Sequence, residues 1–224
     1  MSVLVREDIE QALDRPGELR HRLIVTPMLD RRSQLGPASL DLRLGTEFIE
    51  IQRHREGSLD PMSLRRPASH ADEAVSIGLG ERVVLHPGQF VLGSTLEFVH
   101  LPPDLAGQVL SRSSWGRVGL VVATAVTLQP GWTGMVTLEL ANQGSVPIAL
   151  YPGLRVAQLV LWSAAEPTNH AYDVASTRPK YRKPLGPEAS RLVLETDELE
   201  RLRRVASRLG EHPAQPRPPD NEPP

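Results

Sequence analysis

The clearest pattern in the chain is the alternation of apolar and polar residues around GPASLDLRLG, residues 36–45. The apolar positions on one face are Leu40, Leu42 and Leu44. Ser39, Asp41 and Arg43 fall on the other face. A side-chain period of two is that of a strand with one buried face. The pattern therefore predicts a half-buried strand over residues 38–52.

Two other segments follow a helical period instead. REDIEQALD, residues 6–14, brings Ile9, Ala12 and Leu13 to one side and predicts a short helix. DELERLRRVASRLG, residues 197–210, is amphipathic, with Asp197 as its expected N-cap and Gly210 as its stop.

Residues 80–162 hold many short apolar runs separated by turn signals such as Pro130-Gly131, Gln143-Gly144 and Pro152-Gly153. Such spacing predicts an all-β barrel or sandwich. Within this block VLSRSSWGRVGL, residues 109–120, resembles a strand that carries arginines and serines. The polar residues 53–77 are expected to form a long surface excursion.

The same patterns predict the domain organisation. We expect one β-barrel domain over residues 1–190, which includes a polar C-terminal segment after residue 163. A helical extension is expected at 191–210, and a Pro-rich disordered tail at 211–224.

Composition narrows the class of protein. The 224 residues carry 25 basic and 27 acidic side chains, a net charge of -2, which argues against a general nucleic-acid or membrane-surface binder. The absence of cysteine excludes disulfides and thiolate zinc sites, including those of zinc-dependent base deaminases. With no apolar run of transmembrane length and an early-charged N-terminus, a cytoplasmic protein is expected.

Several motifs together resemble one family. They are VREDIEQAL, GPASLDLRLG, LHPGQFVLGSTLEFVHLPPDLAGQVLSRSSWGRVGL, PGWTGMVTLELANQG and PIALYPGLRVAQL. This arrangement is similar to the dCTP deaminase branch of the dCTP deaminase/dUTPase superfamily. The resemblance implies an all-β fold with minor helices, a distorted β-barrel or jelly roll of the dUTPase-like type. It also implies a homotrimer with active sites between subunits.

The resemblance further implies a substrate and partners. The expected reaction converts dCTP to dUTP and ammonia without zinc, and so supplies dUTP for thymidylate synthesis. Mg²⁺ is expected to arrive with the nucleotide triphosphate, no residue is assigned as a metal ligand, and dTTP is an expected feedback inhibitor. No nucleic-acid or membrane partner is expected.

The family's catalytic residues match three positions of this chain. The resemblance makes Glu139 the general base and proton shuttle, Ser113 the residue that positions the attacking water, and Arg117 the neighbour of the catalytic carboxylate. Deamination at cytosine C4 needs an activated water and a shuttled proton, and one carboxylate can serve both needs. Alternation places Glu139 on the strand face opposite Leu138 and Leu140.

Substrate-binding positions follow from the same resemblance. Arg112 and Ser114 match triphosphate-binding positions, and arginine suits phosphate because its donors form a planar fork. Ala125 is expected to line the base pocket. The remaining expected contacts are Gln129, Gln158 and the lid residues Tyr172 and Lys180, which lie in the segment expected to close over nucleotide.

Two departures from the family pattern leave alternatives open. Gln129 stands where the family usually has an aspartate, and a neutral amide accepts hydrogen bonds but cannot act as a base. The lid also lacks a glutamine commonly found after its Lys-Tyr pair. A bifunctional dCTP deaminase/dUTPase, a dUTPase, and a non-catalytic nucleotide-binding sensor or scaffold therefore remain alternatives.

Individual residues also have structural alternatives. Arg112 and Arg117 can instead be surface arginines that pair with Asp104 or Glu97. Glu139 can be an ordinary exposed strand glutamate. Ser111 is expected to be structural, and Trp115 is expected to pack in the core or an interface.

Overall fold

The computed structural model describes residues 2–51, 72–122, 127–172, 183–191, 201–205 and 208. The chain divides into two compact units, one of residues 1–53 with 70–189 and the other of residues 54–69 with 190–224. In the second unit residues 201–205 and 208 are helical. No helix in the described part of the chain is both long and apolar enough to span a membrane.

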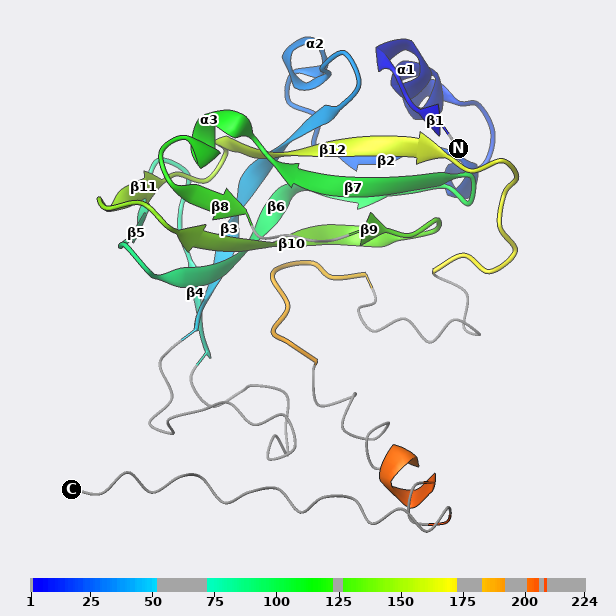
Figure 1. Ribbon diagram of the computed structural model, residues 1–224. Helices are drawn as coiled ribbons and strands as arrows, with labels where there is room; N and C mark the ends of the chain where they lie inside the picture. The colour runs from blue at the N-terminus through cyan, green and yellow to red at the C-terminus, as the bar shows by residue number, and fades with distance from the viewer. Residues whose placement is uncertain are drawn as a thin grey trace, which may run out of the picture. The chain divides into compact units, whose positions relative to one another are not determined.

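Short helices cover the edge of the first unit (Figure 1). They are α1 (Arg6–Asp14), η1 (Leu19–His21), α2 (Arg31–Gln34) and α3 (Ser113–Gly116). Helix α1 confirms the prediction from periodicity, since Ile9 and Ala12 are buried. It ends at Asp14, because the next residue, Arg15, precedes a proline and takes non-helical backbone angles, φ -53° and ψ 124°. Helix α2 is capped by the side chain of Asp30, which accepts the amides of residues 32 and 33.

Strands dominate the first unit. Their bounds are β1 (Ser2–Val3), β2 (Ile24–Thr26), β3 (Leu40–Ile51), β4 (Asp72–Ser76), β5 (Val83–Leu85), β6 (Phe90–His100), β7 (Leu105–Ser111), β8 (Leu120–Val122), β9 (Thr127–Leu128), β10 (Thr133–Asn142), β11 (Ile148–Leu150) and β12 (Arg155–Ser163). Among the described residues one sheet follows the order β8-β10-β6-β3-β12-β7-β9, with β1, β2 and β4 attached to it, and β5 pairs with β11 in a second sheet. Neighbours pair antiparallel throughout.

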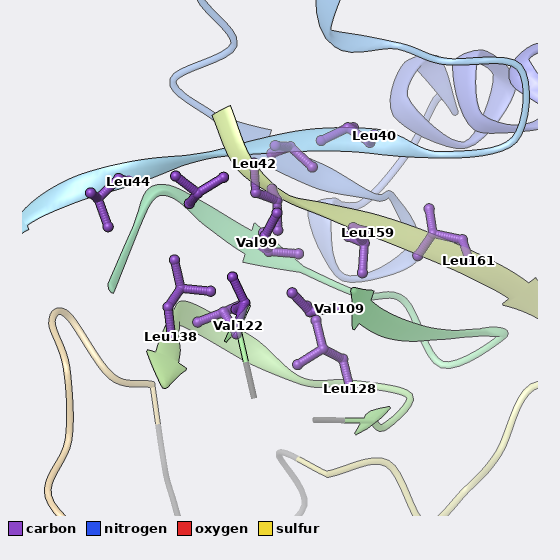
Figure 2. Close-up of a cluster of buried hydrophobic side chains, with 14 of the residues drawn as sticks. Leu40, Leu42, Leu44, Val99, Val109, Val122, Leu128, Leu138, Leu159 and Leu161 are labelled. Carbon is purple, nitrogen blue, oxygen red and sulfur yellow. The ribbon is translucent and has the colours of Figure 1, made fainter. Parts of the chain in front are cut away.

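The large sheet curls around a core of leucine and valine. Figure 1 shows β7 and β12 on one side and β8 and β10 on the other, with β3 and β6 connecting them. Figure 2 shows side chains from both sides meeting in the interior, among them Leu42, Val109 and Leu138, each 0% exposed. The prediction of an all-β, barrel-like fold is confirmed.

Two local predictions were wrong. Residues 72–76 belong to β4 and pair with β3, although the polar stretch 53–77 predicts a surface excursion. Residues 109–120 do not form one strand, because α3 separates β7 from β8. In the first case β4 forms because β3 provides its hydrogen-bond partners, and the polar sequence of this segment gives no sign of that pairing.

Candidate active site

The segment that holds most of the expected site residues is a closed loop between β7 and β8. At its base the Ser111 hydroxyl donates to the Val122 carbonyl at 3.1 Å and accepts the Val122 amide at 3.0 Å. Ser111 therefore has the structural role expected of it. The loop between these bonds carries α3.

Trp115 fixes α3 against the barrel. Its indole Nε1 donates to the Arg155 carbonyl at 2.8 Å, and its ring packs against the core. Ser113 and Ser114 lie in the same turn with exposed side chains, and Arg117 follows it, also exposed. The Arg117 amide donates to the Ser113 carbonyl at 3.1 Å, which keeps these two residues one helical turn apart. A partly buried tryptophan thus holds a turn in which two serines and an arginine are exposed to solvent.

A close backbone contact holds the other end of the loop. Gly119 has φ +92°, and a β-carbon there would lie 2.6 Å from the backbone of Gly144. The Gln143 amide also donates to the Gly119 carbonyl at 2.8 Å. Only glycine fits this position, so the loop is tied to the turn that follows β10.

Arg112, the residue before α3, forms an ion pair that the sequence analysis missed. Its Nη1 lies 2.8 Å from Oδ2 of Asp41 on β3, and Nη1 of Arg155 lies 3.4 Å from the same oxygen. The alternative that Arg112 pairs with Asp104 or Glu97 is wrong. Asp104 pairs with Arg15, and Glu97 pairs with Arg43.

Burial and charge act in opposite directions on Asp41. Its side chain is 15% exposed, and this burial raises the pKa of the carboxyl above its usual value. The positive charges of three nearby arginines oppose the rise. They are Arg112, Arg155 and Arg43. A signal for Asp41 was present in the sequence, because alternation along β3 turns it away from the leucine face.

Glu139 lies on β10 as the alternation predicts. Leu138 and Leu140 are 0% exposed, and Glu139 between them is half-buried on the opposite face. Strand β8, which follows α3, pairs with β10 at Leu140↔Val122. The loop that carries Ser113 and Arg117 thus leads directly into β8, the strand next to β10. Among the described residues, no hydrogen bond joins the side chain of Ser113 or Arg117 to Glu139.

Three further expected residues lie around this region. Gln129 is exposed in the turn before β10. The Tyr172 amide donates to the Pro130 carbonyl at 2.7 Å, so the start of the expected lid is anchored beside Gln129. Gln158 on β12 pairs in register with Asp41 and with Leu110, which places it next to the carboxylate that Arg112 contacts.

The C-terminal segment returns to β10 after a part of the chain that the structure does not describe. Pro184 accepts the Met135 amide at 2.8 Å, and the Glu188 amide donates to Oγ1 of Thr137 at 3.2 Å. Figure 1 shows this segment running beneath β10. Two expected site residues, Ala125 and Lys180, lie outside the described residues.

Comparisons with known proteins agree on one family. Residues 3–164 match the model of the dCTP deaminase-like family. A curated dCTP deaminase of Natronomonas pharaonis is 44% identical over 191 residues, covering 85% of this chain and 94% of that protein. A protein of Nocardia farcinica named "dCTP deaminase, dUMP-forming" is 43% identical over 177 residues, covering 77% of this chain and 85% of its own.

A solved structure supports the fold. The crystal structure of 2′-deoxycytidine 5′-triphosphate deaminase from Agrobacterium tumefaciens aligns with a TM-score of 0.54 at 23% identity. The alignment covers 78% of this chain and 50% of that longer chain.

Proposed function

Since this chain belongs to the dCTP deaminase-like family, we propose that it hydrolyses dCTP to dUTP and ammonia. The observation that carries the proposal is the position of Glu139. It is a half-buried carboxylate on β10, and the loop with Ser113 and Arg117 continues into the adjacent strand β8.

The reaction needs one carboxylate to move protons twice. Glu139 takes a proton from water as the water oxygen attacks C4 of cytosine, and it delivers this proton to N3. It then transfers a proton from the new hydroxyl to the amino group, and the C4–N bond breaks to release ammonia. A single general acid–base residue within reach of these atoms supplies the whole sequence without a metal-bound hydroxide.

Ser113 and Arg117 have supporting roles in this proposal. The exposed Ser113 hydroxyl holds the water by a hydrogen bond, and the Arg117 guanidinium stabilises negative charge on the tetrahedral intermediate. Because α3 is fixed by Trp115, both groups need little rearrangement when substrate binds.

The other end of the substrate is assigned to Arg112 and Ser114, which would bind the triphosphate together with its Mg²⁺. Tyr172, anchored at Pro130, begins the segment that would close over it. The same triphosphate contacts would accept dTTP as a feedback inhibitor.

We propose a homotrimer because the face of the sheet that carries Glu139 has exposed apolar side chains. On this face Ala141 pairs with Phe90 on one side and Val121 on the other, and both of these apolar side chains are 39% exposed. An exposed apolar surface beside a polar site is typical of a subunit interface. Burial of this surface by another copy would exclude water from Glu139.

One incubation with two measurements tests the proposal. Purified protein is incubated with dCTP and Mg²⁺, ammonia is measured by a coupled assay, and the nucleotide product is separated by chromatography. Ammonia and dUTP are expected in equal amounts. Tight dCTP binding without ammonia would instead favour the sensor or scaffold alternative.

A second candidate is a dUMP-forming deaminase. It is favoured by the Nocardia farcinica relative, which carries that name at an identity close to that of the plain dCTP deaminases. Gln129 argues against it, because pyrophosphate release needs a base to orient the second water and an amide cannot be one. The appearance of dUMP and pyrophosphate in the same chromatogram would establish this alternative.

A further inference from the structure

We propose that Asp41 is a positioning residue for triphosphate binding, because it holds Arg112 and Arg155 in one fixed pair. This inference rests on the proposed function. In this proposal Asp41 does not contact the substrate, and it affects binding only through the two arginines. The argument concerns their contacts, the support behind Asp41 and the net charge of the cluster.

The contacts leave most of each guanidinium available. Nη1 of Arg112 and Nη1 of Arg155 both meet Oδ2 of Asp41, at 2.8 and 3.4 Å. Nη1 of Arg155 also donates to the Ser33 carbonyl at 2.8 Å. Within the described part of the chain all side-chain bonds of these two arginines use Nη1. An arginine has five N–H donors, so Nε and Nη2 of each remain for phosphate oxygens.

Both arginines are also attached through their backbones. The Arg112 amide donates to the Val156 carbonyl at 3.3 Å, and the Arg155 carbonyl accepts the indole N–H of Trp115. Their side chains are 30% and 37% exposed. The two guanidinium groups are therefore partly exposed to solvent, while the backbones of Arg155 on β12 and of Arg112 at the start of α3 are fixed by hydrogen bonds.

A buried polar network fixes Asp41 from behind. Nε2 of Gln34 donates both to the Asp41 carbonyl at 3.0 Å and to Oε1 of Glu97 at 2.8 Å. The Arg43 amide, two residues from Asp41, donates to Oε2 of Glu97 at 2.8 Å. Gln34 and Glu97 are 0% exposed, so the backbone from Asp41 to Arg43 is bound to a buried hydrogen-bond network.

The charges of the cluster do not cancel. Three arginines, Arg43, Arg112 and Arg155, face two carboxylates, Asp41 and Glu97. One positive charge is left over, and it lies on the exposed arginines because Arg43 and Glu97 neutralise each other in the interior. The arrangement favours a polyanion with several closely spaced oxygens, which is the chemistry of a triphosphate.

Two roles for Asp41 predict opposite signs. If Asp41 only neutralised the arginines, its removal would increase the positive charge and tighten binding of a polyphosphate. If Asp41 positions them, its removal frees two long side chains, and binding weakens because they must be ordered again. The sign of the change in affinity therefore separates the two roles.

The experiment measures tripolyphosphate binding by calorimetry and dCTP turnover in the native protein and in Asp41→Asn. We expect about tenfold weaker tripolyphosphate binding and an equal rise in KM for dCTP, with kcat within about twofold. The matched control is Asp14→Asn, which removes the carboxylate of an exposed pair with Arg31 and should change neither value. Unchanged or tighter binding in Asp41→Asn, or equal weakening in the control, overturns the proposal.

Two further variants test the mechanism. Asp41→Glu keeps the charge but moves the carboxylate, and it should weaken tripolyphosphate binding by about threefold if geometry matters. In an Arg112→Gln background, Asp41→Asn should have a smaller effect than in the native protein; an undiminished effect means that Asp41 does not act through Arg112. Calorimetry does not depend on turnover, so a native protein that releases no ammonia contradicts the proposed function without deciding this inference.

Discussion

Gly134 and Pro184 pack so closely that a β-carbon on Gly134 would overlap Cδ of Pro184. Residues 183–189 dock on β10 through this contact and through the bond from the Met135 amide to the Pro184 carbonyl. The docked segment lies on the strand that carries Glu139. Its position therefore depends on the absence of a side chain at one glycine.

Gly134→Ala should detach this segment from β10. The added methyl group cannot be accommodated against a proline ring, so we expect hydrogen exchange of the Met135 amide to become at least about tenfold faster. The control is Gly80→Ala. Gly80, like Gly134, has a positive φ (+92° and +150°), but no atom lies within 4 Å of a β-carbon added at Gly80. Equal protection of Met135 in all three proteins would contradict the docking.

The buried pair of Arg43 and Glu97 predicts a large loss of stability. Arg43→Met leaves a carboxylate with 0% exposure without its cationic partner, and we expect the free energy of unfolding to fall by about 3 kcal/mol. Urea denaturation measures this change. The exposed pair of Arg31 and Asp14 is the comparison, and Arg31→Met should lower the free energy of unfolding much less, because solvent already screens this pair.

The same carboxylate predicts a pH dependence. Burial raises the pKa of Glu97 above its ordinary 4.5, although hydrogen bonds from Arg43 oppose the rise. Between the two pKa values the folded protein binds more protons than the unfolded chain, so this group adds stability as the pH falls. Relative to Glu97→Gln, the native protein should gain stability from neutral pH downward and level off below about pH 4.5. A pH-independent difference in urea midpoints would contradict the raised pKa.

The sequence predicts the parts of this fold that depend on local pattern. Helix α1 and the leucine face of β3 follow from periodicity alone, because one face of each is buried against the core. The interruption of residues 109–120 by α3 could not be predicted in the same way. It depends on a hydrogen bond from Trp115 to Arg155, a residue far along the chain, and such contacts leave no local pattern.

The candidate site likewise has a part that local sequence pattern predicts and a part that depends on contacts between distant residues. Glu139 could be located because the leucines on both sides of it define its face. The partner of Arg112 could not, since the sequence alone does not show that Asp41 lies nearer to Arg112 in the folded chain than Asp104 or Glu97 does. Asp41 becomes that partner through the pairing of β3 with β12, which brings it beside Arg155 and the start of α3.

Glu139→Gln should separate chemistry from binding. The amide keeps the shape of the side chain but cannot accept the proton of water, so kcat for dCTP should fall by about a thousandfold with KM changed less than about threefold. Glu50→Gln, at an exposed glutamate of β3, is the matched control and should retain full activity. Ammonia release at the native rate by Glu139→Gln would remove Glu139 from the mechanism.

Phe90→Asp should dissociate the proposed trimer. A charge on the apolar surface around Ala141 must be desolvated when subunits associate, and this costs several kcal/mol for each interface. Light scattering after size-exclusion chromatography should give a trimer for the native protein and a monomer for the variant. Leu79→Asp, at a turn residue that is 74% exposed, should remain trimeric. A native monomer would contradict the proposal directly.

The order of the large sheet has a consequence for how this protein can change. Strand β6 lies between β3, which carries Asp41, and β10, which carries Glu139. Under the proposed function, the carboxylate that positions the triphosphate-binding arginines and the carboxylate that moves protons thus lie on separate strands, whereas the loop around α3 carries residues assigned to both tasks. Substitutions on β3 are therefore expected to change triphosphate affinity while leaving β10 and its proposed general base unaltered.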